Sequence, residues 1–186
     1  MTNPCVPFAA EALGRLRGAA YEAVLENDKH IVPDIYPAWD STNADVTLTG
    51  TSLVGQLLAI DAVVKGRPQW FSLNINLGPG RFSTGDVIGF VMETGAGAPM
   101  TLNLHILSSQ DGKLSQTGLP EKLDLSGDPQ VVTSLHTLGP HDPIIASQTY
   151  HTLVINLPAH DFRLDLRAMR FFVVDAAFGL RSAPEP

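Results

Sequence analysis

Cysteine, basic side chains and long apolar runs are all scarce in this sequence. Cys5 is the only cysteine among 186 residues, so neither an internal disulfide nor a thiolate metal cluster can form. No stretch approaches the roughly 20 apolar residues that a membrane-spanning helix needs. Twelve Lys and Arg residues against nineteen Asp and Glu give a net charge of −7, which repels phosphate backbones. The sequence therefore argues against nucleic acid as a partner and against insertion into a membrane.

A secretory signal is also missing from the beginning of the sequence. Residues 1–18, MTNPCVPFAAEALGRLRG, contain no basic segment followed by a continuous apolar run. We therefore expect a cytoplasmic protein by default, with release by a signal-less route as the alternative.

Helical periodicity is limited to one segment. Only residues 8–28 repeat apolar side chains at spacings of three and four, which predicts a helix that packs on the main body. Parallel sheets need crossover helices, and the remaining sequence shows none. Instead it consists of short alternating apolar runs separated by many of the 16 Gly and 14 Pro residues. We predict a mainly β protein of eight to ten strands, an antiparallel jelly-roll β-sandwich with one N-terminal α-helix.

The same patterns divide the chain into three regions. Residues 1–44 hold the helix and a proline-rich loop that packs on or extends the main domain, 45–176 form the β-sandwich, and 177–186 form a flexible tail. Within the loop, Pro33 and Pro37 disfavour helix for the residues before them. The loop is expected to expose Tyr36 and Trp39, which with the helix would offer a docking element to a partner or a sister subunit.

Patterns that support catalysis or metal binding are missing. The late histidines are five, ten and nine residues apart, whereas zinc and iron ligands usually stand in closer pairs. The segment GTSLVG lacks the strand-turn-helix setting of a nucleophile elbow. No two carboxylates are spaced in a way that singles them out for glycoside hydrolysis. The sequence therefore assigns no catalytic residue, no cofactor and no metal, and it favours a non-enzymatic role.

One strand carries an unusual polar row. The segment QWFSLNINLGPG, residues 69–80, alternates with a period of two, which is typical of a half-buried strand. Its apolar row is Phe71, Leu73, Ile75 and Leu77, and its polar row is Trp70, Ser72, Asn74 and Asn76. The segment MTLNLHIL adds Asn103 and His105 in the same manner, and YHTLVINL adds Tyr150, Thr152 and Asn156.

These rows would form one face if their strands share a sheet. The face would be rich in amides, hydroxyls and aromatic rings and almost free of Lys and Glu, which ordinary solvated faces carry. Sugars suit such a face because their C–H surfaces stack on aromatic rings and their hydroxyls need donors and acceptors. The alternative is a merely solvated or oligomer-covered face. The candidate ligand-binding residues are Trp70, Asn74, Asn76, Asn103, His105 and Tyr150.

The end of the chain adds a resemblance. The segment FRLDLRAMRFFVV is similar to the closing strand of jelly-roll carbohydrate-binding modules, and WFSLNINL, GDVIGFVME and MTLNLHIL resemble their core strands. The resemblance covers about residues 45–176, and bacterial sandwich proteins without an assigned role share the spacing. It implies a module that binds an oligosaccharide or polysaccharide. It also places Asp165 where such modules often hold a structural calcium.

Three functions follow from these observations. The leading hypothesis is a non-catalytic glycan-binding β-sandwich. The alternative is a structural or interaction component of a larger assembly, such as a phage-like particle or a surface complex, docked through the N-terminal helix or joined into a homo-oligomer. The third is a hydrolase or lyase on the same fold.

Overall fold

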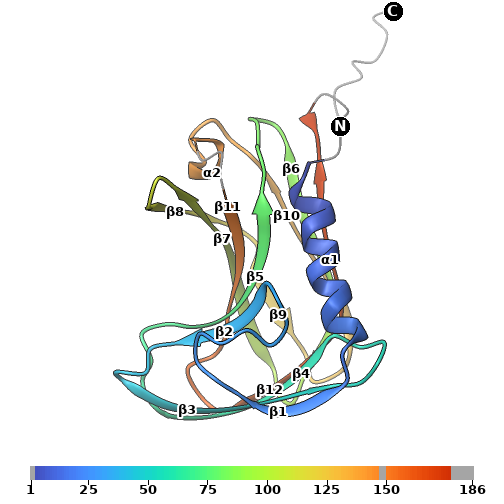
Figure 1. The fold of residues 1–186 in the computed structure, drawn as a ribbon, viewed down its shortest axis with the longest axis vertical. Helices are drawn as coiled ribbons and strands as arrows, with labels where there is room; N and C mark the ends of the chain where they lie inside the picture. The colour runs from blue at the N-terminus through green and yellow to red at the C-terminus, as the bar shows by residue number, and fades with distance from the viewer. Residues whose placement is uncertain (1–2, 147–149, 177–186) are drawn as a thin grey trace, which may run out of the picture.

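The computed structural model describes residues 3–146 and 150–176, which form two antiparallel sheets with a helix beside them (Figure 1). The predicted flexible tail, 177–186, lies outside the described residues. The elements in chain order are α1 (Cys5–Gly18), β1 (Tyr21–Leu25), β2 (Ile35–Trp39), β3 (Ala44–Ser52), β4 (Leu58–Gly66), β5 (Phe71–Pro79), β6 (Val87–Ala96), β7 (Met100–Gln110), β8 (Lys113–Gly118), β9 (Leu123–Leu125), β10 (Gln130–Thr137), α2 (Pro143–Ala146), β11 (Tyr150–Asn156) and β12 (Phe162–Val174).

The strand order confirms the predicted jelly-roll β-sandwich with its N-terminal helix. The first sheet has the order β1-β3-β4-β12-β6-β10, and the second has the order β2-β5-β11-β7-β8, with β9 pairing to β7. Two late strands, β11 and β12, insert between earlier ones, which is how a jelly roll interleaves its chain. Every pairing between these strands is antiparallel. No helix in the described residues has the length and apolar character needed to span a bilayer.

The core lies between the two sheets, and the alternation along the strands determines which side chains enter it. On β5, Leu73, Ile75 and Leu77 are buried, and on β7 Leu104 is buried, as the period of two predicts. A tight turn joins β7 to β8: Asp111 and Gly112 adopt φ of 50° and 74°, as a two-residue hairpin turn requires.

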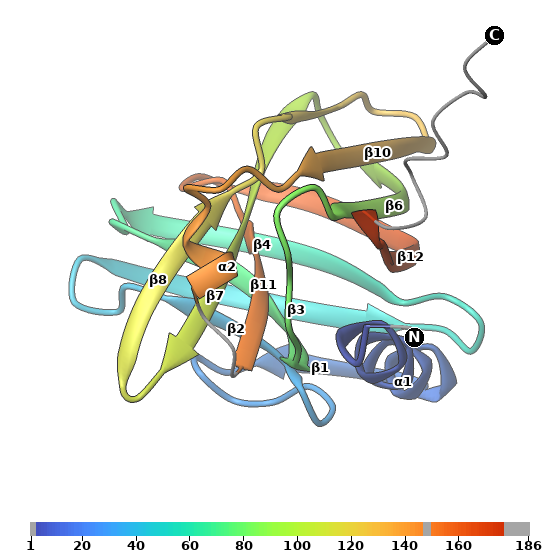
Figure 2. The same cartoon turned by 90° about the horizontal axis from the view of Figure 1, so that it is seen from above.

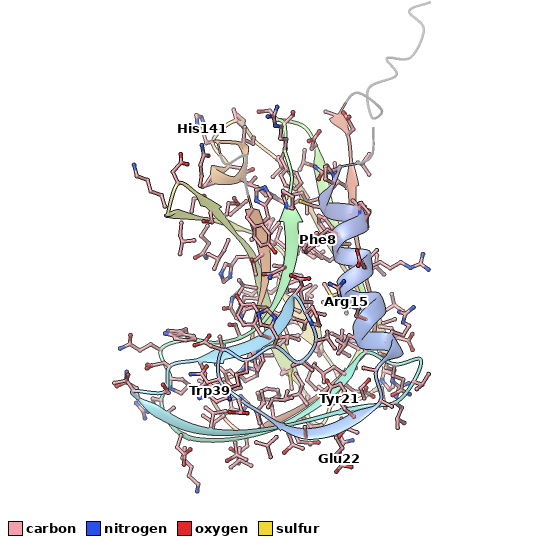
Figure 3. The ribbon with its side chains drawn as sticks, in the orientation of Figure 1. Phe8, Arg15, Tyr21, Glu22, Trp39 and His141 are labelled. Atoms are coloured by element: carbon pink, nitrogen blue, oxygen red, sulfur yellow. The ribbon has the colours of Figure 1, made fainter. Side chains whose placement is uncertain are left out.

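Helix α1 extends the core at one side of the sandwich, on the opposite side of the molecule from β7 and β8 (Figure 2). It buries the apolar side predicted from its spacing, including Leu13 and Leu16. Figure 3 shows Phe8 and Arg15 on the side of the helix that faces the strands. The Phe8 ring lies where a Cβ on Gly78 would be, within 2.5 Å, so only glycine allows this close approach of α1 to β5.

The predicted helix over residues 8–28 is wrong in its second half. Helix α1 ends at Gly18, and the chain then forms β1, whose residues pair with β3 from Tyr21↔Ser52 to Leu25↔Leu48. The apolar spacings of three and four beyond Gly18 do not mark a buried helix face, since Val24 is 67% exposed. Pairing with a strand distant in the sequence outweighs the local helical preference of this segment.

The predicted loop around Tyr36 and Trp39 is also different in the structure. These residues form β2, an edge strand that pairs with β5, and an edge strand tolerates Pro37 because its outer N–H needs no ladder partner. Trp39 is buried rather than exposed and packs edge-on against Phe71, with the ring centroids 6.1 Å apart (Figure 3). Tyr36 points to the opposite face of the sheet. Both β1 and β2 therefore belong to the sheets, although they lie within residues 1–44.

Truncation of the inward rows tests this register. We expect Leu73→Ala and Leu104→Ala each to lower the free energy of unfolding by roughly 2–5 kcal/mol, because each removes buried apolar surface and leaves a cavity. The matched control is Val131→Ala, since Val131 is 68% exposed and should cost little. Denaturant midpoints measure the effect, and wild-type midpoints for both leucine variants would show a register shifted by one residue.

His151 generates a prediction about pH. The ring is fully buried, with Nδ1 2.9 Å from the Ser108 hydroxyl and Nε2 3.2 Å from the Gly80 carbonyl. Burial lowers the pKa of His151 below its usual 6.5. The unfolded chain therefore binds a proton more readily, so this residue's contribution to stability is complete above about pH 6.5 and is lost as the pH falls toward the folded-state pKa.

Unfolding titrations between neutral and acidic pH measure this contribution. His151→Gln should flatten the decline in stability below pH 6.5, because it removes the buried imidazole. Equal declines in the wild type and in His151→Gln would contradict the assignment.

Candidate functional site

A groove with a volume of about 500 Å³ crosses the outer face of the second sheet. That volume falls within the range of sites that bind small organic ligands. Strands β2, β5, β11, β7 and β8 all contribute side chains, together with the turn before β2 and the residue before β5. The lining residues are Asp28, Tyr36, Ala38, Trp70, Ser72, Asn74, His105, Leu107, Gln116, Val154 and Asn156.

The cross-strand register brings the predicted polar rows together. Asn74 of β5 lies opposite Tyr36 on one side and Val154 on the other, and Val154 in turn lies opposite His105 of β7. The neighbouring row joins Ser72, Asn156 and Asn103 in the same order. The three strands therefore share one sheet, and their polar rows share one face, as the alternation predicts.

Ser72 and Asn74 form the floor of the groove rather than an open surface. Only 6% and 5% of their respective surfaces are exposed. The Asn74 amide nitrogen donates to the Ser72 hydroxyl at 3.1 Å and to the Tyr36 carbonyl at 3.4 Å. These bonds connect β5 to β2. They also occupy much of the hydrogen-bonding capacity of the Ser72 and Asn74 side chains.

Trp70 forms one wall of the groove and is the most exposed aromatic residue in it. It immediately precedes β5, and 49% of its surface is accessible. Its carbonyl accepts a hydrogen bond from the Asp40 backbone N–H at 3.0 Å. The Asp40 carboxylate accepts from the Asn43 amide and from the Gln69 backbone N–H, and these bonds lower the pKa of Asp40. The indole is thus presented from a well-bonded loop rather than from the strand itself.

His105 and Asn156 form a bonded pair in the middle of the groove. The Asn156 amide nitrogen lies 3.2 Å from Nδ1 of His105 and donates to the Asn103 carbonyl at 3.1 Å. An amide nitrogen can only donate, so Nδ1 accepts and the ring proton resides on Nε2. Burial lowers the pKa of His105, which keeps the ring neutral near pH 7. The groove therefore contains a neutral imidazole with a defined tautomer.

Three of the predicted site residues share the face but do not line the groove. The Asn76 amide donates to Asp34 at 3.3 Å, and its oxygen accepts from Thr152 at 3.0 Å. Asn103 is exposed beside the groove. Tyr150 packs edge-on against Phe8 of α1, with the ring centroids 6.2 Å apart. A role for these three in ligand binding stays a prediction.

Two polar lining residues, Asp28 and Gln116, are missing from the sequence-based set, as are the apolar Ala38, Leu107 and Val154. Gln116 could have been found, because Asp-Gly at residues 111–112 is a strong hairpin-turn signal. Counting residues across that turn places Gln116 opposite Leu107. Asp28 offered no such signal, since its segment read as the end of a helix. The position of Asp28 depends on its bond to β2, and residues 35–39 are recognisable as a strand only from their pairing with β5.

Asp165 does not fit a calcium site in this structure. Its carboxylate accepts from Nε of Arg167 at 3.0 Å, whereas calcium requires six to eight oxygen ligands. Within residues 3–146 and 150–176, no three His, Cys, Asp or Glu side chains gather in a way that could hold a metal ion. The outward row of β12 carries arginine on both sides of this aspartate, at Arg163 and Arg167. The calcium expected from the resemblance has no support from these contacts.

Comparison with known proteins adds information on the fold. No protein-family model and no curated protein sequence matches the chain. Among solved structures, it is similar to a CBM4 module (TM-score 0.51, 16% identity, 80% of this chain and 94% of that one). It is also similar to the CBM22-1 xylan-binding domain of Xyn10C from Paenibacillus barcinonensis (TM-score 0.50, 10% identity, 84% and 97%).

A third similar structure comes from a phage. The enzymatically active domain of tailspike protein 4 from bacteriophage CBA120 has a TM-score of 0.50 and 9% identity, over 76% of this chain but only 20% of that one. At these identities the likeness concerns the fold alone. The chain therefore has the jelly-roll β-sandwich fold found in carbohydrate-binding modules.

The tautomer of His105 is a testable feature of the groove. We expect nitrogen-15 NMR of the imidazole to show the neutral Nε2–H form at pH 7, titrating below the ordinary histidine pKa of 6.5 because burial disfavours the charged ring. Asn156→Leu, which removes the donor to Nδ1, should disturb this tautomer preference. A predominant Nδ1–H form in the wild type would contradict the described hydrogen bond.

Proposed function

We propose that the chain is a non-catalytic glycan-binding module whose ligand lies in the groove across the second sheet. The observation that carries this proposal is the combination of an exposed indole, Trp70, with neutral hydrogen-bonding side chains in one groove. The fold shared with carbohydrate-binding modules is consistent with it but does not identify a ligand.

The aromatic side chains suit the apolar faces of sugar rings. Trp70 and Tyr36 both line the groove, and both come from its β2–β5 end. Burying C–H groups against such rings removes apolar surface from water, and an indole offers a large flat area for that contact. Leu107 and Val154 continue the apolar surface toward β8. A ligand whose two ring faces are apolar would therefore be held along the length of the groove.

The polar side chains suit the sugar hydroxyls. In the described part of the chain, no protein group forms a hydrogen bond with the side-chain oxygen of Asn156 or with the side-chain amide of Gln116. The Nε2–H of His105 is likewise available to a ligand, because Asn156 occupies only Nδ1. These groups provide donors and acceptors without charge, which a hydroxyl can satisfy in either role. Asn74 and Ser72 mainly hold the floor in place.

The length of the groove favours an oligosaccharide over a single sugar. It extends over five strands. Neighbouring strands lie about 4.8 Å apart, so the outer two are separated by roughly 19 Å. A monosaccharide would contact only a part of this surface, whereas a linear chain would reach both Trp70 and Gln116. We therefore infer that affinity increases with the length of the oligosaccharide.

The alternatives receive less support from the contacts. A docking element built from the N-terminal helix and Trp39 is disfavoured, because Trp39 is buried and α1 packs its apolar side into the core. Hydrolysis by paired carboxylates is disfavoured as well, since Asp28 is the only carboxylate among the described residues that line the groove. An assembly role that uses another surface would not depend on Trp70.

Removing the indole tests the proposal. We expect Trp70→Ala to weaken binding of the best ligand from a glycan array at least about tenfold, equivalent to about 1.4 kcal/mol, because the stacking surface is lost. The melting temperature should change little, since Trp70 is half exposed. Isothermal titration calorimetry measures the affinity. The control, Val131→Ala, removes exposed apolar surface from the opposite sheet and should leave binding intact.

Two outcomes would contradict the proposal. Unfolding of Trp70→Ala would show that the indole is part of the core. Wild-type affinity in a folded Trp70→Ala protein would place the ligand elsewhere.

A further inference from the structure

The groove contains one charged side chain, and it is negative. Of the described lining residues, Asp28 alone carries a formal charge at pH 7, because no Lys or Arg lines the groove and His105 is neutral. A ligand that enters the groove therefore meets a carboxylate without a cation beside it. The sign of that charge bears on which glycans the groove can accept.

Asp28 is held in place by a well-bonded turn. The Asn27 side chain pairs with the Trp39 backbone like a neighbouring strand, since its nitrogen donates to the Trp39 carbonyl at 3.0 Å and its oxygen accepts from the Trp39 N–H at 2.8 Å. The Asp28 N–H donates to the Pro37 carbonyl at 3.0 Å, and Asp28 adopts a φ of 58°. These bonds attach the backbone of residues 27–28 to β2. The fold itself therefore holds the Asp28 carboxylate at the groove.

Asp28 and Tyr36 line the same groove, and no cation in the described part of the chain pairs with the Asp28 carboxylate. Burial raises the pKa of Tyr36, and the negative charge of Asp28 adds to this increase. Lys29, the next residue, pairs instead with Glu26 at 2.6 Å. Arg15, on α1, pairs with Asp34 and Glu11. Among the residues that the structure describes, none forms an ion pair with Asp28.

We propose that the groove prefers glycans that carry free amino groups over their uncharged counterparts, and that it binds glycans that carry carboxylates more weakly than either. The Asp28 carboxylate, in the groove that Tyr36 also lines, is the recognition element for the ammonium group. This proposal rests on the proposed function, because it names the class of glycan bound at the same groove.

Electrostatic attraction and cation–π attraction both favour an amine-bearing glycan over a neutral one. An ammonium group near Asp28 gains an opposite charge, and one placed over the face of Tyr36 or Trp70 gains attraction to the ring. A uronate would bring a second negative charge to a groove without a cation, in a protein whose net charge is −7. Because Asp28 is exposed, the preference is moderate and is screened by salt. We expect it to reach about fivefold, equivalent to about 1 kcal/mol.

The experiment compares glycans that differ only in charge. The full chain is first applied to an array of neutral, amine-bearing and uronate oligosaccharides in several linkages. Calorimetry at low and at high ionic strength then compares each binding oligosaccharide with its glucosamine-type and uronate-type counterparts of the same linkage and length. At low salt the amine-bearing member should bind most tightly and the uronate-type member several-fold more weakly than the neutral one, and both differences should shrink at high salt.

Two variants assign the preference to Asp28. Asp28→Asn should retain binding of the neutral oligosaccharide and lose the preference for the amine, since asparagine keeps the shape and also tolerates positive φ. The matched control is Asp111→Asn, which makes the same change at another exposed aspartate with positive φ, in the β7–β8 turn outside the groove. This control should keep the wild-type preference.

The outcomes separate the two proposals. Equal affinity for neutral and amine-bearing members, tight binding of a uronate, or a preference that survives in Asp28→Asn would overturn the charge selectivity while glycan binding stands. Failure of every oligosaccharide on the array to bind would overturn both.

Discussion

The alternation of side chains along β5 ties the core of this protein to its groove. The strand lies between β2 and β11, so both of its edges pair with neighbouring strands. Leu73 and Ile75 enter the core, while Ser72 and Asn74 face the groove. A slip of one residue would move two polar side chains into the apolar core and two apolar ones onto the outer face. The composition of the groove floor is therefore determined by the same register that stabilises the fold.

The polar side chains of the face divide into two groups with different tasks. Asn74 and Asn76 are largely occupied by bonds to Ser72, Asp34 and Thr152, so they connect strands and shape the floor. The groups left available come from the other end of the groove, from the strands β7, β8 and β11. This arrangement places a rigid scaffold toward the β2–β5 end of the groove and the available hydrogen-bonding groups toward β8, which lowers the cost of ordering side chains when a ligand binds.

The strands with a clear period of two could be predicted from sequence, and so could the polar face. The rows of β5, β7 and β11 needed only the assumption of a shared sheet, which the register confirms. The segments before residue 40 could not be predicted in the same way. Tyr21–Leu25 carries spacings that also suit a helix, and only its pairing with β3 makes it a strand. Trp39 looked exposed because prolines surround it, and its burial follows from β2 pairing at the sheet edge.

The same limit explains which site residues escaped prediction. Asp28 reaches the groove through a turn whose geometry depends on bonds between Asn27 and Trp39, twelve residues apart in the sequence. Local sequence patterns cannot predict hydrogen bonds between segments that are this far apart in the chain. Conversely, Asn76 and Tyr150 belong to the predicted face, but hydrogen bonding to Asp34 and packing on Phe8 engage them outside the groove lining. Alternation predicts on which face of the sheet a side chain lies. Whether that side chain is free to contact a ligand depends on contacts from segments distant in the sequence.

The central claim is that the ligand lies across β5, β11, β7 and β8. Chemical-shift mapping by nitrogen-15 NMR, during titration with the tightest-binding oligosaccharide of the array, tests it directly. The account predicts that the Trp70 indole signal and the side-chain amide signals of Asn156 and Gln116 shift together, while the amides of β10 on the opposite sheet do not. Shifts confined to β10 and its neighbours in the first sheet, with the Trp70 signal unchanged, would contradict it.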